Sequence, residues 1–186
     1  MDASMYARAL DRTRGVVAGT RRDQLGDPTP CTDWDVRTLL NHLIGGCITF
    51  AAGAEGRPVD MDGPEDHAAE DHVAAYDRAS KAARAAFESP GALEREFSLP
   101  WGDTPGTAAL GLALADAVVH GWDLAQATGQ ELAIDDDTAE VIYEMTSSMM
   151  QPNGSYPRGD SFKDPVAVGD DAPIAHRMVA YLGRRP

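Results

Sequence analysis

The sequence predicts an all-α protein, an antiparallel four-helix bundle with short additional helices toward its C-terminal end. Three observations carry this prediction. Apolar residues recur at helical spacing in several long segments. No segment rich in Val, Ile and Thr alternates cleanly as a half-buried strand does. Clusters of Gly and Pro separate the periodic segments, as expected of loops that join neighbouring helices.

We expect the first helix over about residues 3–20 and the second to end near Ala52. Residues 27–30 between them contain two prolines, which stop any helix because proline lacks an amide hydrogen. Thr32, with Asp35 three residues later, resembles a capping box at the start of the second helix. The buried stripe predicted for this helix consists of Val36, Leu39, Leu40, Leu43, Ile44, Cys47 and Phe50.

A third helix is expected over residues 65–88, with Glu65 and Asp66 at its positive N-terminal end. Its predicted core stripe consists of Val73, Tyr76, Ala83 and Phe87, and His72 falls near the inner face by angular count. Residues 89–106 are rich in Gly and Pro and are therefore predicted to form a loop.

The fourth helix is expected over residues 107–128 and to end at Gly129, a residue suited to a C-terminal cap. It is apolar on nearly every face, so we expect it to be the most buried helix. A fifth helix is expected to start near Asp136. A surface loop over residues 151–170 and a short last helix over about 171–182 complete the chain.

The length of 186 residues fits one domain, which we expect to span residues 1–186. The formal net charge of −14 argues against nucleic acid or an anionic membrane as a partner, because both attract basic patches. The N-terminus lacks the apolar core of a signal peptide, and the longest apolar stretch, residues 108–119, is too short to span a bilayer. We therefore expect a cytoplasmic protein. The two cysteines, Cys31 and Cys47, do not form a Cys-X-X-Cys pattern, so a cysteine-based zinc ribbon is excluded.

The ionisable residues of the fourth helix share one narrow face. Asp116, His120 and Asp123 lie at positions i, i+4 and i+7 of an otherwise apolar segment. Burying such a face costs several kcal/mol unless something compensates. A divalent cation compensates well, because it binds carboxylate and neutral imidazole, and residues four apart can reach one ion. The alternatives are a simple ion pair between Asp116 and His120, or a solvated face.

His42 supplies a third candidate ligand from the second helix. It lies roughly sixty degrees beyond the edge of the apolar stripe, at the boundary of the core. Gly45 and Gly46 follow, although each costs about 1 kcal/mol in a helix relative to alanine. They leave space beside the imidazole for an ion, a ligand or a close helix. The alternative is a boundary histidine bonded to a neighbour, with glycines that only permit close packing.

Three ligands, His42, Asp116 and His120, would leave a coordination position open, as in catalytic zinc sites. Asp123 is then a candidate for a carboxylate that orients the imidazole N–H of a metal ligand. The alternative is an ordinary salt bridge or a solvated residue near the helix end. His72 is a reserve ligand.

The other candidates are weaker. His67 and His176 fit surface positions. Cys31 precedes a helix start, which can lower a thiol pKa, but a packed and inert cysteine is the preferred interpretation.

Three segments resemble a known family, the mycothiol-dependent maleylpyruvate isomerase-like proteins. They are PTPCTDWDVR with LLNHL at residues 28–43, VHGWDLA at 119–125 and AYLGR at 180–184. The family belongs to the DinB-like metal-binding four-helix bundles. Its metal triad corresponds to His42, Asp116 and His120, although the isomerase has Glu where this chain has the shorter Asp116. The isomerase also carries a further C-terminal domain, for which residues after the bundle leave no room here, so the resemblance implies fold and metal site rather than the maleylpyruvate reaction.

The resemblance implies a metal-dependent, mycothiol-type thiol transferase or isomerase, with a small thiol and an electrophilic substrate as its partners. Zinc is the preferred ion, with nickel and iron as alternatives, and mycothiol is the implied thiol cofactor. A homodimer is also implied. The alternative function is a non-catalytic metal-binding bundle, such as a stress-related binding protein. A third interpretation is a helical bundle with a buried polar cluster and no ion.

Overall fold

The computed structural model describes residues 1–31, 33–57, 66–69, 71–150, 158, 162–169 and 171–186. The described chain is mostly helical, with six α-helices and a small antiparallel sheet of two strands. It forms two compact units, Asp2–Leu132 and Ala133–Pro186. The prediction of an all-α protein is therefore approximate, because it left out the sheet.

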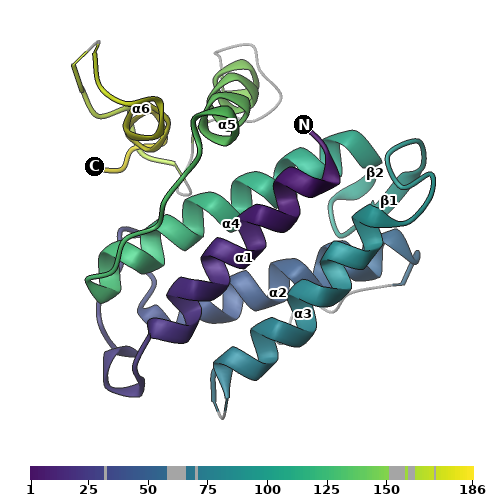
Figure 1. Ribbon diagram of the computed structural model, residues 1–186, viewed down its shortest axis with the longest axis horizontal. Coiled ribbons are helices and arrows are strands. Elements are labelled where there is room, and N and C mark those ends of the chain that lie inside the picture. Colours follow the sequence, from purple (N-terminus) through teal and green to yellow (C-terminus); the bar gives the residue numbers. More distant parts are fainter. Residues whose placement is uncertain (32, 58–65, 70, 151–157, 159–161, 170) are drawn as a thin grey trace. The chain divides into compact units, whose positions relative to one another are not determined.

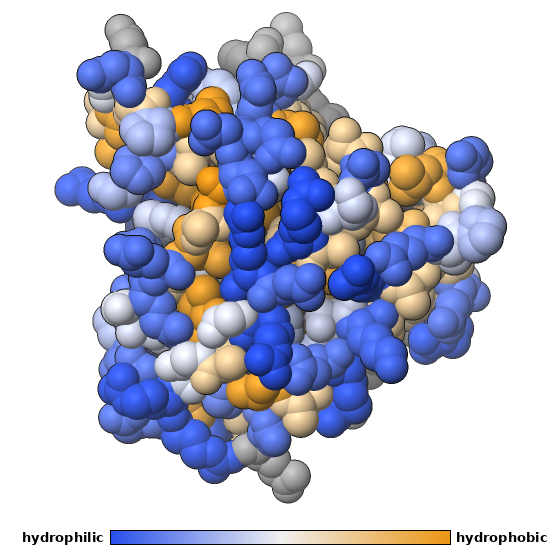
Figure 2. All heavy atoms as spheres, viewed as in Figure 1, coloured by the Kyte–Doolittle hydropathy of each residue, from blue (hydrophilic) through white to orange (hydrophobic). Residues whose placement is uncertain are grey.

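The larger unit contains four long helices and the sheet. Its elements are α1 (Ala3–Gly19), α2 (Val36–Ala54), α3 (His72–Glu88), β1 (Glu96–Leu99), β2 (Gly102–Pro105) and α4 (Gly106–Thr128). α1 packs against α3 and α4, and α2 packs against the same two helices (Figure 1). The stripe predicted for α2 is confirmed, since every member is at most 5% exposed. Hydrophilic residues cover much of the surface in Figure 2.

α2 begins three residues later than the predicted capping box requires. Asp35 is itself the N-cap, and its carboxylate accepts a hydrogen bond from the Thr38 amide at 2.8 Å. Its pKa lies below the usual range, because the backbone N–H of Thr38 stabilises the charged form. Thr32 lies outside the described residues. The predicted start signal is therefore real, but Asp35, expected as the last residue of the capping box, is itself the N-cap.

α3 starts at His72 rather than near residue 65, after the N-cap Asp71. Glu65 lies outside the described residues. Asp66 does not serve the helix end as predicted. Its carboxylate instead accepts hydrogen bonds from Arg37 at 2.8 Å and Asn41 at 3.1 Å, both on α2. The charge of Asp66 therefore takes part in a tertiary contact with α2 and does not stabilise the N-terminal end of α3.

The predicted loop over residues 89–106 contains β1 and β2, which pair with Phe97 opposite Thr104. Phe97 and Leu99 are buried, whereas the residues between and before them are exposed. The ring of Phe97 stacks on that of Phe87, with centroids 4.9 Å apart. Packing of two apolar side chains therefore stabilises a hairpin whose alternation is only four residues long.

α4 is the core helix that the sequence predicted. Most of its residues are buried, and it ends at Gly129, whose φ of 68° is the left-handed conformation that glycine adopts readily. By length and composition α4 could cross a membrane, but 72% of its most apolar window is buried inside the structure, as in the core helix of a folded domain.

The smaller unit contains α5 (Asp136–Met149) and α6 (Ile174–Tyr181), which pack against each other. Both start close to the predicted positions. Tyr143 and Tyr181 meet edge to face with ring centroids 5.4 Å apart. Residues 151–157, 159–161 and 170 of the predicted loop over 151–170 lie outside the described residues, and its described residues belong to no helix or strand.

Candidate metal centre

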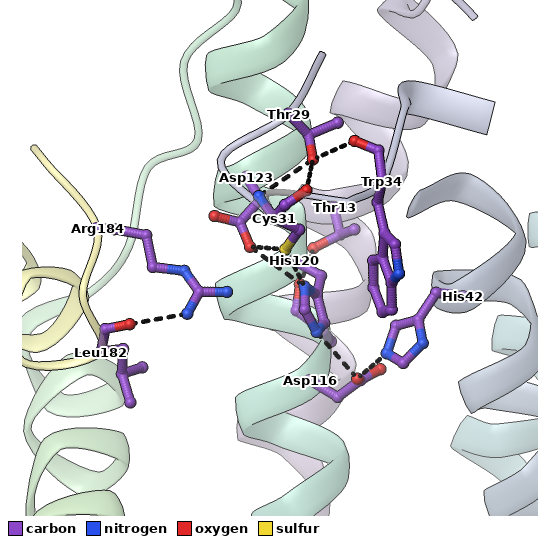
Figure 3. A network of polar contacts seen from close by, with 11 residues as sticks. Thr13, Thr29, Cys31, Trp34, His42, Asp116, His120, Asp123, Leu182 and Arg184 are labelled. Atoms are coloured by element: carbon purple, nitrogen blue, oxygen red, sulfur yellow. Dashed lines mark hydrogen bonds and ion pairs between the residues drawn. The ribbon is translucent and has the colours of Figure 1, made fainter. Parts of the chain in front are cut away.

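Two helices of the larger unit bring His42, Asp116 and His120 together. His42 lies on α2, and the other two lie one turn apart on α4. Asp116 Oδ1 is 2.8 Å from His42 Nε2 and 3.7 Å from His120 Nε2. Figure 3 shows both imidazoles directed at this carboxylate. The structure thus unites the three candidate ligands from the sequence, with ligand atoms all within 4.8 Å of one another.

The cluster lies at the edge of the core and is partly open to solvent. The side chain of His42 is 37% exposed, that of Asp116 23% and that of His120 16%. The predicted boundary position of His42 is therefore confirmed. A small ligand has a route to these side chains that a fully buried cluster would not offer.

Burial acts against both charges of the His42–Asp116 pair, and their mutual attraction outweighs it. Burial lowers the pKa of His42, but the charge and hydrogen bond of Asp116 raise that pKa above its usual value. Burial raises the pKa of Asp116, but His42, with a smaller contribution from the charge of His120, holds that pKa below its usual value. Without a metal the pair therefore favours the imidazolium–carboxylate form.

Asp123 supports His120 from the opposite side of its ring. The residue is completely buried, and its Oδ2 lies 3.2 Å from His120 Nδ1. Because a carboxylate faces Nδ1, the neutral imidazole of His120 carries its hydrogen on that nitrogen, which leaves the lone pair of Nε2 on the side of Asp116. This arrangement fits the role predicted for Asp123, which is to orient the imidazole N–H of a candidate ligand. The alternative of a solvated residue near the helix end is wrong.

Gly46 has a definite role at the site. A Cβ atom at this position would lie 2.8 Å from Asp116 Oδ2, so only glycine leaves room for the carboxylate. A Cβ atom at Gly45 would meet nothing within 4 Å. Of the two helix-weakening glycines, Gly46 therefore makes space for a candidate ligand.

Trp34 is a site residue without a role predicted from its sequence position. Its indole lies beside both histidines, with centroids 4.6 Å from His42 and 5.6 Å from His120. The two imidazole centroids are themselves 4.6 Å apart. Trp34 precedes α2 in the chain, and the sequence signal for it was its place in the segment shared with the known family.

Cys31 also reaches the site, beside Asp123. Its Sγ lies 3.2 Å from Asp123 Oδ2, the same oxygen that faces His120, and 3.7 Å from His120 Nδ1. Cys31, His120 and Asp123 therefore form a second group of ligand-type atoms that shares His120 with the first. The expectation of an inert, packed Cys31 did not include this contact with the site.

The remaining candidates lie elsewhere. His72 is 7% exposed, its Nε2 has no hydrogen-bond partner among the described residues, and it belongs to neither ligand group, so the geometry gives no support to it as a reserve ligand. His176 is exposed, as predicted. Cys47 is a core residue, and burial, with the charge of Asp116, raises its pKa to about 12.

The donor set of His42, Asp116 and His120 fits a divalent ion. Two nitrogen or oxygen ligands of one zinc ion lie roughly 3–3.5 Å apart, because each lies about 2 Å from the metal. The observed separations of 2.8 and 3.7 Å lie on either side of that range. Small side-chain rotations would therefore allow all three residues to bind one ion.

Comparison with known proteins identifies the family. The model of the mycothiol maleylpyruvate isomerase N-terminal domain matches residues 6–125. Two Mycobacterium tuberculosis proteins, from strains CDC 1551 and H37Rv, are each 35% identical over 188 residues. The alignments cover 99% of this chain and 98% of each relative, and both relatives are described as uncharacterized. No solved structure gives a significant match. The chain therefore belongs to the family of mycothiol maleylpyruvate isomerase N-terminal domains.

Proposed function

We propose that this family member binds one divalent metal ion on His42, Asp116 and His120. With that ion it acts as a thiol transferase or a thiol-dependent isomerase that uses a small thiol of the mycothiol type. The observation that carries the proposal is the convergence of three ligand-type atoms from α2 and α4 on one point, with their supporting contacts. The family match supports a metal-binding, mycothiol-related domain. The packing of α1 to α4 supports a DinB-like bundle as its frame.

We propose zinc as the ion, with nickel and iron as alternatives, because the donor set contains two imidazoles and one carboxylate. Three protein ligands leave a coordination position for an external ligand, as catalytic zinc sites do. A divalent ion bound there would lower the pKa of a coordinated thiol and favour the thiolate at neutral pH.

The chain's own residues prepare this site. Asp123 fixes the ring of His120 with its Nε2 toward Asp116. Asp116 supplies one negative charge to a site that must accept a divalent cation. The partial exposure of His42 leaves a path for a thiol and an electrophile. These residues would bring the thiol and the electrophile together in a fixed orientation. Such positioning accelerates a bimolecular reaction, because the reactants no longer have to meet by diffusion.

The proposal is tested with zinc-loaded protein, a low-molecular-weight thiol and a panel of electrophiles that includes epoxides, Michael acceptors and alkyl halides. We expect thiol-dependent loss of at least one electrophile, abolished in His120→Ala, which must keep the parent's circular dichroism spectrum. Asp77→Ala, at a surface ion pair, is the control with unchanged turnover. Metal binding without thiol chemistry across the panel would contradict the transferase and support the non-catalytic metal-binding alternative.

A further inference from the structure

Trp34 contacts the two candidate imidazole ligands at once. Its ring lies 4.6 Å from that of His42 and 5.6 Å from that of His120. In Figure 3 the indole stands on one side of the space between the two imidazoles, and Asp116 lies on the other. A single aromatic side chain therefore restricts the rotation of a ligand from α2 and a ligand from α4.

The segment that carries Trp34 is tied down independently of the imidazoles. Pro28 and Asp35 form an isolated antiparallel bridge at its base, and the Val36 amide donates to the Asp27 carbonyl at 3.0 Å. The hydroxyl of Thr29 donates to the Trp34 carbonyl oxygen at 2.9 Å. The backbone therefore holds the indole in place before any ligand arrives.

The other tryptophans lie in different surroundings. Trp101, in the turn between β1 and β2, is 59% exposed and has an edge contact with Phe50. Trp122 is 8% exposed in α4. Among the described residues, Trp34 is thus the tryptophan whose ring contacts are with imidazoles. Trp34 is half-buried beside two candidate metal ligands, a position that core packing alone does not require.

We propose that Trp34 is a positioning residue for both imidazoles and forms an aromatic side of the site that favours a sulfur ligand over a hard oxygen ligand. This inference rests on the proposed function, since it needs a metal on His42 and His120. The indole restricts the rotamers of both imidazoles before an ion binds. Each imidazole therefore loses less side-chain entropy when it binds the ion. A polarisable sulfur gains favourable contacts near an aromatic ring, which a carboxylate oxygen does not.

The first experiment measures zinc affinity by competition with a chromogenic chelator. Trp34→Leu removes the aromatic ring but keeps an apolar side chain, and Trp34→Phe keeps an aromatic face. We expect Trp34→Leu to bind zinc about tenfold more weakly, and Trp34→Phe to recover most of that loss. Trp101→Leu is the matched control, because it removes an exposed indole away from the imidazoles, and it should bind as the parent does. Equal affinity in all four proteins would overturn the positioning role.

The second experiment loads the parent and variants with Co²⁺ and follows its visible absorption. A change of band positions in Trp34→Leu, reversed in Trp34→Phe, would report altered ligand orientation, which a loss of general stability does not produce. Titration with 2-mercaptoethanol and with acetate then compares sulfur and oxygen ligands. We expect the preference for the thiol to fall several-fold in Trp34→Leu. An unchanged preference and spectrum would overturn the inference.

The two proposals fail differently. A parent that binds neither Zn²⁺ nor Co²⁺ overturns both. A parent that binds metal and thiol, alongside a Trp34→Leu variant that binds them identically, overturns the role of Trp34 alone. If circular dichroism shows that Trp34→Leu is unfolded, Trp34→Gln takes its place, because it also lacks a ring and its polar end suits a half-buried position. Zinc binding about tenfold weaker in a folded Trp34→Gln than in Trp34→Phe supports the inference, and equal zinc affinity, Co²⁺ spectrum and thiol preference in the two variants contradict it.

Discussion

Two carboxylates of the larger unit bind nitrogen groups at similar distances, with different consequences. On the surface, Asp77 pairs with Arg14 through contacts of 2.9 and 3.0 Å, and both side chains are more than 40% exposed. At the core boundary, Asp116 lies 2.8 Å from His42 and is 23% exposed. Exposed ion pairs contribute little to stability, because water and salt screen them. Distance alone therefore does not distinguish a surface pair from a functional site.

The difference lies in what surrounds each carboxylate. One guanidinium engages both oxygens of Asp77. Asp116 Oδ1 instead faces two imidazoles, and Gly46 makes room for Oδ2. Asp123 holds one of these imidazoles by its far nitrogen. A carboxylate that faces two imidazole nitrogens, one of them on a ring oriented by a second carboxylate, is the pattern expected of a metal site.

The largest expected effect separates the two carboxylates directly. Asp116→Ala removes a proposed ligand and should weaken zinc binding by more than about 100-fold. Asp77→Ala removes a surface pair and should leave zinc affinity unchanged. Competition with a chromogenic chelator measures both constants. Equal affinities in the two variants would remove the distinction between the pairs.

A smaller effect on zinc affinity is expected from Asp123, which contacts the candidate ligand His120. Asp123→Asn keeps the size of the side chain but weakens its grip on His120, so zinc affinity should fall about 10- to 100-fold. Asp77→Asn is the matched control. Zinc affinity equal to that of the parent, in a variant with an unchanged melting temperature, would show that Asp123 is only a packed carboxylate.

The paired glycines sharpen the comparison further. Gly46→Ala forces Asp116 Oδ2 away from its position, so we expect zinc affinity to fall about tenfold. Gly45→Ala has open space around its new methyl group, so it should keep the zinc affinity and raise the free energy of unfolding by up to about 1 kcal/mol. The two chelator titrations should therefore diverge, and coinciding curves would contradict the close approach of Asp116.

The smallest expected effect is on the pH dependence of the metal-free chain. The pKa of His42 is raised, so its contribution to stability is complete below about pH 6.5 and is lost as the pH rises through the raised value. The pKa of Asp116 is lowered, so its contribution is complete above about pH 3.9 and is lost as the pH falls through the lowered value. The pair therefore stabilises most between about pH 4 and 6.5.

Asp116→Asn tests this window. The imidazole of His42, followed by NMR, should titrate at a lower pH in the variant than in the parent. The difference in free energy of unfolding between the two proteins should be largest inside the window. A difference that is constant from pH 4 to 8 would mean that the pair carries no charge of its own.

The sequence predicted the helices well because their signals are local. The apolar stripe of α2 and the cap at Gly129 depend on residues within one or two turns. The β1–β2 hairpin was missed because Phe97 and Leu99 give too short an alternation to stand out, and it is the core beneath them that favours a strand. The start of α3 was missed because Asp66 bonds to α2 instead.

The candidate site divides in the same way. His42, Asp116 and His120 were found because polar residues on apolar helices stand out by their spacing. Cys31 and Trp34 lie in a segment without periodicity, and its course depends on the bridge between Pro28 and Asp35. A loop that long-range contacts hold in place leaves no local pattern, so its side chains were assigned to the site by the structure.

Metal content most directly tests the claim that α2 and α4 together form a metal site. Elemental mass spectrometry on protein purified without an affinity-metal step would be compared with His42→Ala, since His42 is the candidate ligand from α2. We expect about one zinc ion per chain in the parent and loss of that ion in the variant. A parent that stays metal-free after incubation with zinc, or a variant that keeps its ion, would contradict it.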